Sequence, residues 1–262
     1  MSSTNPYDVR PEAGSYEAGS DEAVVRRVSI RPFQLLQRGY TFLGDQYWLF
    51  VGICLVSLVL GSLVPMGLIT GALTVGVFLC LLDHEAGRRV DFAVLFRGFD
   101  YFVDSLLIIV AVIVASLVVM VPIFVIMMIL MFGGMATLGG QANPDGIVLL
   151  LPLLMMGFLM VVILAASILI YLPFVFCFQL IADQKMKAAD ALRLGWQGAY
   201  QNFGGIFLLL LVQAFIGLLG SLLCYLPAIL FIPIVFSSYF LLYREVYPAF
   251  APPPVASFAP PE

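Results

Sequence analysis

Charged residues are confined to a few short regions of this chain, and the long stretches between them carry none. The twelve basic and sixteen acidic residues fall in residues 8–45, 83–104 and 183–193, with outliers at Asp145, Arg244, Glu245 and Glu262. The chain is 62% hydrophobic and 11% charged, whereas soluble domains are usually about 45–50% apolar and about 25% charged. A membrane-spanning helix needs about 20 mainly apolar residues. The sequence therefore predicts an all-α, polytopic integral membrane protein.

The uncharged intervals predict about six transmembrane helices. The first two are short for full crossings, which leaves open whether residues 47–82 cross the membrane twice. The fourth is longer than one crossing needs and contains Pro152 and Pro173, which predict bends. The predicted spans are Tyr47–Val64, Met66–Leu82, Ser105–Phe132, Ile147–Ala182, Phe203–Cys224 and Leu226–Tyr243.

The basic residues predict the orientation of these spans. With six spans, both tails and the loops 83–104 and 183–202 share one side of the membrane, and that side holds every Arg and Lys. Basic segments are retained in the cytoplasm during insertion, so both termini are expected to be cytoplasmic. Residues 1–28 are expected to form a disordered cytoplasmic tail, 29–246 the six-helix membrane domain, and 247–262 a Pro-rich disordered tail.

Three short stretches with a common pattern precede long apolar runs. Aligned on Gly39, Gly98 and Gly195, each has a leucine three residues earlier, an aromatic residue next, and a polar pair six and seven residues later. The pattern predicts three repeats, each an interfacial helix followed by a transmembrane hairpin. Coincidence is the alternative, because leucine, glycine and aromatic residues are abundant here. The candidate lipid-interface residues of these helices are Arg38, Tyr40, Arg97, Phe99, Arg193 and Trp196.

Two segments near the C-terminus resemble a known family. Ala191, Leu192, Arg193, Trp196, Asn202 and Phe203 lie in the first segment, and Leu242, Tyr243 and Arg244 in the second. They resemble the bacterial membrane domain named for its fusion to glycerophosphodiester phosphodiesterases, together with its uncharacterised six-span relatives. Gly195 stands where that family usually has serine, and the match ends after Arg244. The resemblance implies a six-helix domain of unknown biochemical role in the bacterial cytoplasmic membrane. This sequence contains no phosphodiesterase domain, so that activity is not expected.

No predicted span contains an ionisable residue, which argues against proton-coupled carriers, ion pumps and intramembrane hydrolases. The polar run Asp83, His84 and Glu85 ends the second span. Adjacent residues on a helix diverge by about 100°, so these three cannot face one metal ion without a sharp turn or ligands from elsewhere. An ordinary polar helix end is the favoured interpretation, and no catalytic, cofactor-binding or metal-binding residue is predicted.

Two amides and four thiols lie inside the predicted spans. Gln179 and Gln213 are costly in hydrocarbon, so each is expected to form an interhelical hydrogen bond or, as the alternative, to line a polar cavity. The thiols of Cys54, Cys80, Cys177 and Cys224 are expected to pack as small apolar groups.

These features predict a non-enzymatic protein that organises the membrane, contacts lipid or acts as a scaffold. Membrane lipids are the expected partners, with other membrane proteins as a second class. A nucleic-acid partner is not expected, because the net charge is −4 and no basic face is clustered. The alternative function is a permease or facilitator for a neutral or amphipathic solute that uses Gln179 or Gln213. The sequence leaves the oligomeric state open.

Overall fold

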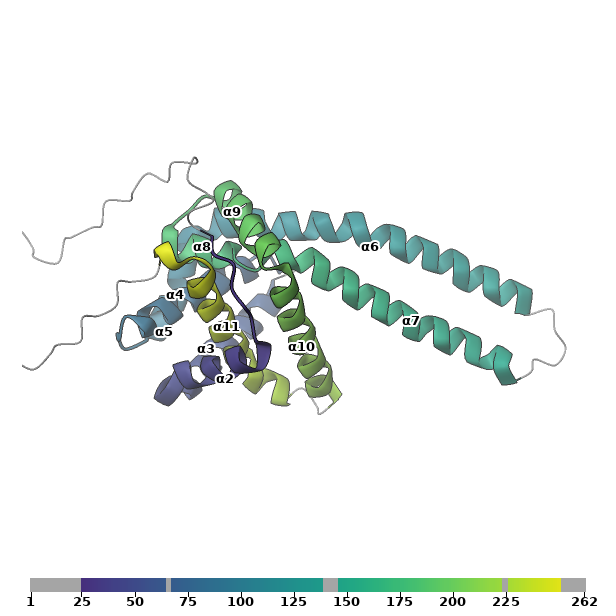
Figure 1. Ribbon diagram of the computed structural model, residues 1–262, viewed down its shortest axis with the longest axis horizontal. Coiled ribbons are helices and arrows are strands. Elements are labelled where there is room, and N and C mark those ends of the chain that lie inside the picture. The colour runs from purple at the N-terminus through teal and green to yellow at the C-terminus, as the bar shows by residue number, and fades with distance from the viewer. Residues whose placement is uncertain (1–24, 65–66, 139–145, 223–225, 251–262) are drawn as a thin grey trace, which may run out of the picture.

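The structure is a computed structural model that describes residues 25–64, 67–138, 146–222 and 226–250, and these ranges form helices without a strand. Figure 1 shows their arrangement. The helices are α2 (Pro32–Leu43), η1 (Gly44–Gln46), α3 (Tyr47–Leu63), α4 (Thr70–Glu85), α5 (Phe92–Phe96), η3 (Arg97–Tyr101), α6 (Phe102–Leu138), α7 (Gly146–Tyr171), η4 (Leu172–Phe174), α8 (Cys177–Gln184), α9 (Ala188–Gln201), α10 (Phe203–Leu222), α11 (Leu226–Val246) and η5 (Pro248–Phe250).

The helical membrane fold predicted from the charge pattern is confirmed. Five segments of the described chain are long and apolar enough to cross a membrane: Pro32–Leu63, Phe92–Leu130, Leu154–Gln184, Phe203–Gly220 and Pro227–Val246. The predicted second span is the exception. It corresponds to α4, which has 16 residues, nine of them buried. At about 1.5 Å per residue this helix is about 24 Å long, shorter than a hydrocarbon core of about 30 Å.

The predicted fourth span is broken at Pro173. The helix α7 runs through Pro152 to Tyr171, and a 3-10 turn with Pro173 at its second position then separates it from α8. Proline has no N–H to continue the helical hydrogen bonds, so the chain changes direction here. The short α8 that follows is largely buried and ends at Lys185, which adopts a left-handed conformation with φ of 53°.

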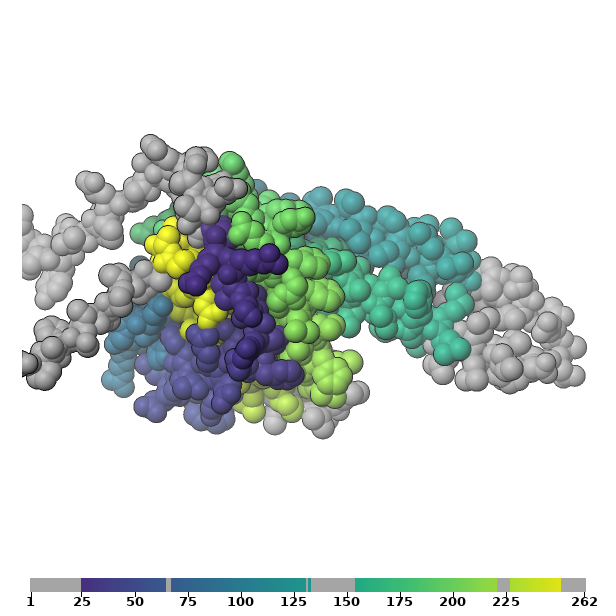
Figure 2. Space-filling model, viewed as in Figure 1, coloured from purple at the N-terminus to yellow at the C-terminus, as the bar shows by residue number. Residues whose placement is uncertain are grey.

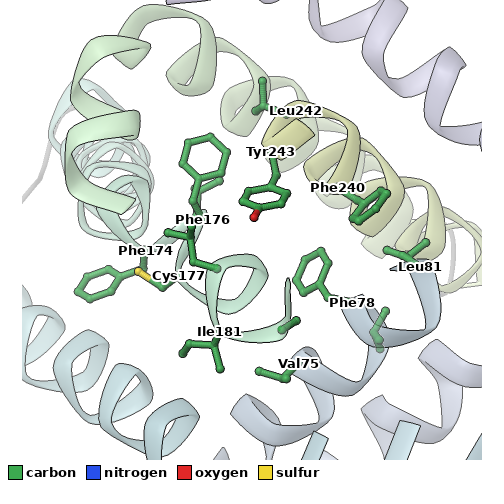
Figure 3. Close-up of a cluster of buried hydrophobic side chains, with 14 of the residues drawn as sticks. Val75, Phe78, Leu81, Phe174, Phe176, Cys177, Ile181, Phe240, Leu242 and Tyr243 are labelled. Atoms are coloured by element: carbon green, nitrogen blue, oxygen red, sulfur yellow. The ribbon is translucent and has the colours of Figure 1, made fainter. Parts of the chain in front are cut away.

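The inner layer of the bundle consists of α4, α8 and α11, which we call the inner helices. Each ends one hairpin: α3 leads to α4, α6 and α7 lead to α8, and α10 leads to α11. Aromatic side chains of α4 and α11, with Phe176 just before α8, gather in the core, as Figure 3 shows for Phe78, Phe176, Phe240 and Tyr243. The α6–α7 hairpin extends away from the inner helices (Figure 1) and exposes apolar side chains, among them Leu117, Phe124, Phe158 and Val161.

The three aligned glycines belong to α2, η3 and α9, and each contacts an inner helix at close range. The α5–η3 segment lies on α4, where a Cβ atom on Gly98 would stand 2.6 Å from the backbone nitrogen of Gly76 and closer still to the carbonyl oxygen of Ala72. A Cβ atom on Gly76 would likewise stand 2.9 Å from the carbonyl carbon of Leu95. Two glycines facing one another thus let the backbones of these two helices touch.

Gly195 of α9 contacts the η4–α8 segment in the same way. A Cβ atom there would lie 3.1 Å from Sγ of Cys177 and 3.4 Å from the carbonyl oxygen of Pro173. The Cys177 thiol lies 3.7 Å from the carbonyl oxygen of Pro173, four residues earlier on its own segment. It also lies 3.6 Å from the carbonyl oxygen of Ala191, four residues before the glycine.

Gly39 of α2 repeats this geometry on α11. Its Cβ atom would lie 2.8 Å from Oγ of Ser238 and 3.1 Å from the carbonyl oxygen of Ile234. The Ser238 hydroxyl lies 2.6 Å from the carbonyl oxygen of Ile234, four residues earlier, and 3.5 Å from that of Leu35, four residues before the glycine.

In each case a glycine meets a carbonyl and the small residue four positions later, on an inner helix or, for Pro173, on the η4 turn before it: Ala72 and Gly76, Pro173 and Cys177, Ile234 and Ser238. The second and third glycine-bearing helices each contact the inner helix of the hairpin that precedes them. Thus α5–η3 contacts α4, and α9 contacts α8. The first, α2, contacts α11, the inner helix of the last hairpin, so the three contacts form a closed ring. The spacing that predicted three repeats thus corresponds to three equivalent glycine contacts, although α4 is too short to complete a transmembrane hairpin in the first of them.

The packed domain extends beyond its predicted bounds of 29 and 246 at both ends. Residues 25–28 lie on the bundle, where the N–H of Arg26 donates to the carbonyl of Val246 (2.8 Å) and that of Val28 to the side chain of Asn202 (2.7 Å). At the other end Tyr247 is fully buried, and its hydroxyl donates to the carbonyl of Leu194 (2.9 Å). The packed domain thus extends from residue 25 to residue 250 of the described chain.

Candidate functional site

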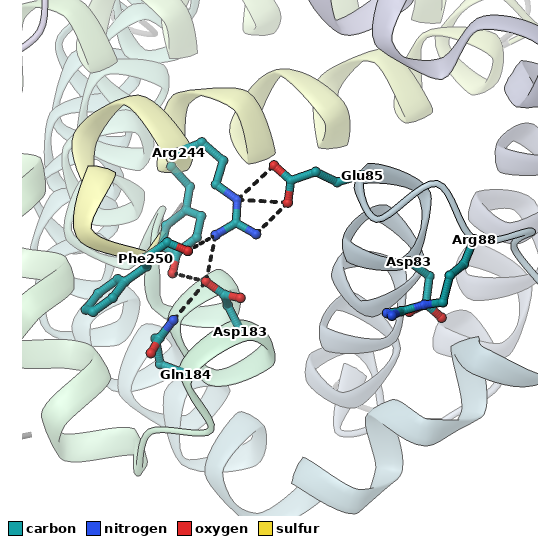
Figure 4. A network of polar contacts seen from close by, with 8 residues as sticks. Asp83, Glu85, Arg88, Asp183, Gln184, Arg244 and Phe250 are labelled. Carbon is teal, nitrogen blue, oxygen red and sulfur yellow. Dashed lines mark hydrogen bonds and ion pairs between the residues drawn. The ribbon is translucent and has the colours of Figure 1, made fainter. Parts of the chain in front are cut away.

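The inner helices end together at one cluster of charged side chains, drawn in Figure 4. Arg244 near the end of α11 lies between Glu85 at the end of α4 and Asp183 near the end of α8. Its Nε is 3.1 Å from both Glu85 carboxylate oxygens, its Nη2 is 2.5 Å from Oε2 of Glu85, and its Nη1 is 2.9 Å from Oδ2 of Asp183. The Tyr243 hydroxyl donates to the same Asp183 oxygen (2.8 Å). A single guanidinium therefore joins all three inner helices.

The surroundings of Arg244 suit a structural role. Its side chain is 11% exposed, against 14% for Asp183 and 23% for Glu85. A cation in the last turn of a helix is also favoured by the helix dipole, and the guanidinium lies over the Phe240 ring at 5.2 Å. Each of its three nitrogens already donates to this cluster or to the Phe250 carbonyl. The cluster clamps three helix ends and leaves little of the guanidinium to bind a substrate.

The side chains of Asp83, His84 and Glu85 point in three directions, as the helix geometry predicted. Asp83 pairs with Arg88, whereas Glu85 pairs with Arg244. The Nε2 of His84 is 2.7 Å from the carbonyl oxygen of Phe42, and its ring is packed edge-on against two phenylalanines. His84 thus joins α4 to the end of α2. Within the ranges that the structure describes, no three His, Cys, Asp or Glu side chains are close enough to hold a metal ion.

The aromatic residue after each aligned glycine points outward. Tyr40 is 54% exposed, Phe99 39% and Trp196 57%. The cause is local: successive residues on a helix are about 100° apart, so burying the glycine against an inner helix turns the next side chain away from it. All three arginines are exposed, and Arg38 forms an ion pair with Glu245.

The two intramembrane amides behave differently. Gln213 of α10 accepts a hydrogen bond from the Tyr239 hydroxyl of α11, which confirms the predicted interhelical bond for that residue, although its Nε2 has no partner among the described residues. For Gln179 the prediction of an interhelical bond is wrong. This side chain is 2% exposed, and neither its oxygen nor its nitrogen has a partner in the described chain.

The position of Gln179 explains its isolation. Gln179 lies two residues after Cys177 on α8. The residues two positions after the corresponding small residues of α4 and α11 are Phe78 and Phe240, and both are buried. The amide thus occupies a place in the core that the other two repeats fill with a phenyl ring. Of the four cysteines, Cys54, Cys80 and Cys177 are buried, which confirms their expected packing, and Cys224 lies outside the described residues.

Two apolar grooves lie between α7 and the last hairpin. The larger, of about 970 Å³, is lined by α7, α10 and Phe33 of α2. The smaller, of about 450 Å³, shares Leu164 and Ala214 with it and reaches Gln213 and Tyr239 on α10 and α11. Many lining side chains of the larger groove are exposed, among them Phe215 at 61%. Since α7 and α10 are candidate spans, this groove opens towards the region that lipid chains occupy.

Sequence reasoning did not identify the joint role of Arg244 and Asp183. Arg244 entered only through the family resemblance, and Asp183 was one charged residue among several. A usable signal was present, because a lone arginine ends one apolar helix while carboxylates end two others. Comparison with protein-family models, curated proteins and solved structures finds no match to this chain.

Proposed function

We propose that this protein is a non-enzymatic integral membrane protein that organises lipid through three interfacial helices, α2, α5–η3 and α9. The observation that supports the proposal most directly is the ring of glycine contacts. Each helix is fixed to the bundle by a buried glycine, and the following aromatic residue, Tyr40, Phe99 or Trp196, is exposed. Exposed aromatic residues beside arginines suit the headgroup region of a bilayer, where amphipathic rings accumulate.

The proposed setting follows from the distribution of charge. The charged cluster around Arg244 and the basic residues of the loops belong to the side on which basic residues are retained, so we place both termini in the cytoplasm. The bacterial cytoplasmic membrane and the relationship to the phosphodiesterase-associated membrane domain are part of the same proposal. The exposed apolar α6–α7 hairpin adds a surface on which other membrane proteins can dock.

The depth of the exposed aromatic residues tests the proposal. In the Trp48→Phe background Trp196 is the only tryptophan, and Tyr40→Trp or Phe99→Trp can be placed in the Trp48→Phe/Trp196→Phe background. We expect each single tryptophan, reconstituted in vesicles, to be quenched most by lipids brominated near the headgroup. Strongest quenching by lipids brominated near the chain end, or no quenching by any brominated lipid, would contradict an interfacial position.

A permease is the second candidate, and the unpartnered amide of Gln179 is the observation that favours it. A buried polar group without a partner is costly, so its presence in a native structure needs an explanation, and a functional role is one. Solute uptake by purified protein in liposomes separates the two proposals. Lipid organisation predicts the same uptake as empty vesicles, whereas uptake that exceeds this background and is lost on Gln179→Leu would favour the permease.

A further inference from the structure

One face of α10 lines two cavities, one polar and one apolar. Gly204, Gly205 and Leu208 line a pocket of about 420 Å³ at the start of the helix. Leu211, Phe215 and Leu218 line the apolar groove of about 970 Å³ further along. These residues recur at steps of three or four, so they share one helix face. A molecule that lies along this face therefore reaches both cavities.

The segment before α2 and the first turn of α2 cover the same face. Ile30 packs on Gly205, where a Cβ atom would lie 2.6 Å from Cβ of Ile30, and Phe33 lines the apolar groove. Figure 2 shows this N-terminal segment, in dark purple, passing down the surface beside α10 in green. Arg31 comes between Ile30 and Phe33 in the chain and is exposed, although it lines neither cavity itself.

The first pocket is polar and cationic. Arg27, Ser29 and Gln201 line it, and both Arg27 and Arg31 are exposed. Neither arginine has an ion-pair partner within the part of the chain that the structure describes. Two cations at one end of a helix face therefore favour an anionic group there, and an arginine guanidinium matches the geometry of a phosphate.

The second cavity is apolar and lies about the depth of one leaflet from the first pocket. From Gly204 to Phe215 the helix rises by about 16 Å, and half of a hydrocarbon core is about 15 Å. The groove is walled by the candidate spans α7 and α10, and its lining from α7 and α10 consists of apolar side chains and Gly217. A hydrocarbon chain whose polar end is held at Arg27 therefore extends into the groove.

We infer that this face of α10 is a binding site for one anionic phospholipid of the bilayer, with the phosphate at Arg27 and Arg31 and an acyl chain in the groove between α7 and α10. The inference rests on the proposed lipid contact and makes it specific in headgroup charge and in place. The charge pattern selects an anionic over a zwitterionic lipid, because basic residues near a membrane surface each favour anionic lipid.

Native mass spectrometry of the full-length protein tests the site. The protein in neutral detergent is titrated with phosphatidylglycerol or with phosphatidylcholine of the same chains. We expect one phosphatidylglycerol to be retained in preference to phosphatidylcholine. Arg27→Gln/Arg31→Gln should reduce that preference roughly thirtyfold, and Ala214→Phe, which fills the groove, should reduce retention of both lipids.

Arg89→Gln/Lys187→Gln is the matched control, because it removes two exposed cations elsewhere on the chain. The inference is overturned if the control lowers the preference as much as the arginine variant does, or if Arg27→Gln/Arg31→Gln leaves it unchanged. Circular dichroism of each variant confirms that the helices remain. These outcomes do not depend on the membrane depth of Tyr40, Phe99 and Trp196. The lipid site can therefore be disproved while the interfacial position of the helices is supported, or the interfacial position disproved while the site is supported.

Discussion

A Cβ atom on Gly98 would lie only 2.6 Å from the backbone nitrogen of Gly76. Backbone atoms cannot move aside as the end of a side chain can, so we predict that Gly98→Ala lowers the free energy of unfolding by more than about 3 kcal/mol. Gly195→Ala should cost less, about 1 kcal/mol, because the nearest atom is the Cys177 sulfur at 3.1 Å. Thermal unfolding of the purified variants in detergent shows whether Gly98→Ala lowers the unfolding temperature more than Gly195→Ala does.

Gly157→Ala is the control for this series. Gly157 lies within α7, and a Cβ atom there would have no neighbour within 4 Å. Alanine is a better helix former than glycine by about 1 kcal/mol, so this variant should unfold at the same or a slightly higher temperature. Equal effects of Gly98→Ala and Gly157→Ala would mean that the close contact of α4 with η3 does not limit stability.

Removing the cation from the charged cluster should lower the stability of the protein strongly. Arg244→Met leaves the carboxylates of Glu85 and Asp183 facing one another with little access to water, and loss of one partner of a buried ion pair typically costs about 3–5 kcal/mol. Replacing all three, as Arg244→Met/Glu85→Gln/Asp183→Asn, should restore part of the loss because no unpaired charge remains. Arg88→Met removes the ion pair with Asp83, whose arginine is 66% exposed, and should cost less than about 1 kcal/mol. If Arg244→Met were as mild as Arg88→Met, the clamp would be disproved.

Gln179→Leu should stabilise the protein, in contrast to most core substitutions. The change removes two buried polar atoms without partners, and an unsatisfied buried polar group costs about 1–3 kcal/mol. Gln213→Leu is the comparison, since it removes the acceptor of the Tyr239 hydroxyl and should not stabilise. Unfolding temperatures of the two variants decide the point, and a loss of stability in Gln179→Leu would show that the amide has a partner in solution.

Asn202→Ala should release the N-terminal segment. The Asn202 side chain accepts from the N–H of Val28 and donates to the carbonyl of Arg26, so it holds residues 26–28 on the bundle. Each hydrogen bond contributes about 1 kcal/mol, and we expect amide exchange to become faster at Val28. Exchange within α4 should be unchanged, and protection that persists at Val28 would contradict this role for Asn202.

Much of the fold could be predicted from the sequence because bilayer insertion depends on composition. The absence of charge defines α3, α6, α7, α10 and α11, and the spacing around Gly39, Gly98 and Gly195 defines the repeats. The break at Pro173 makes one predicted span into two helices, and α4 proved to be a short buried helix. Composition does not show this, because an apolar helix has the same residues whether lipid or protein surrounds it.

The candidate site was predicted in part. The pattern indicated which aromatic residues follow the glycines, and a helical step of about 100° fixes their exposure once the glycine is buried. The isolation of Gln179 and the convergence on Arg244 depend on which helix faces which, and residues 183 and 244 are far apart in sequence. The cationic pocket also escaped prediction, because Arg27 lies in a segment whose composition resembles a disordered tail.

The docking of α2 on α11 has a consequence for the order of folding during synthesis. Gly39 leaves the ribosome about 200 residues before Ser238, the residue it contacts. The first helix therefore has no neighbour at this contact until the last hairpin has entered the bilayer. The native ring can close only after translation of nearly the whole chain, so a product truncated before α11 would leave its earliest helix without the surface that holds it.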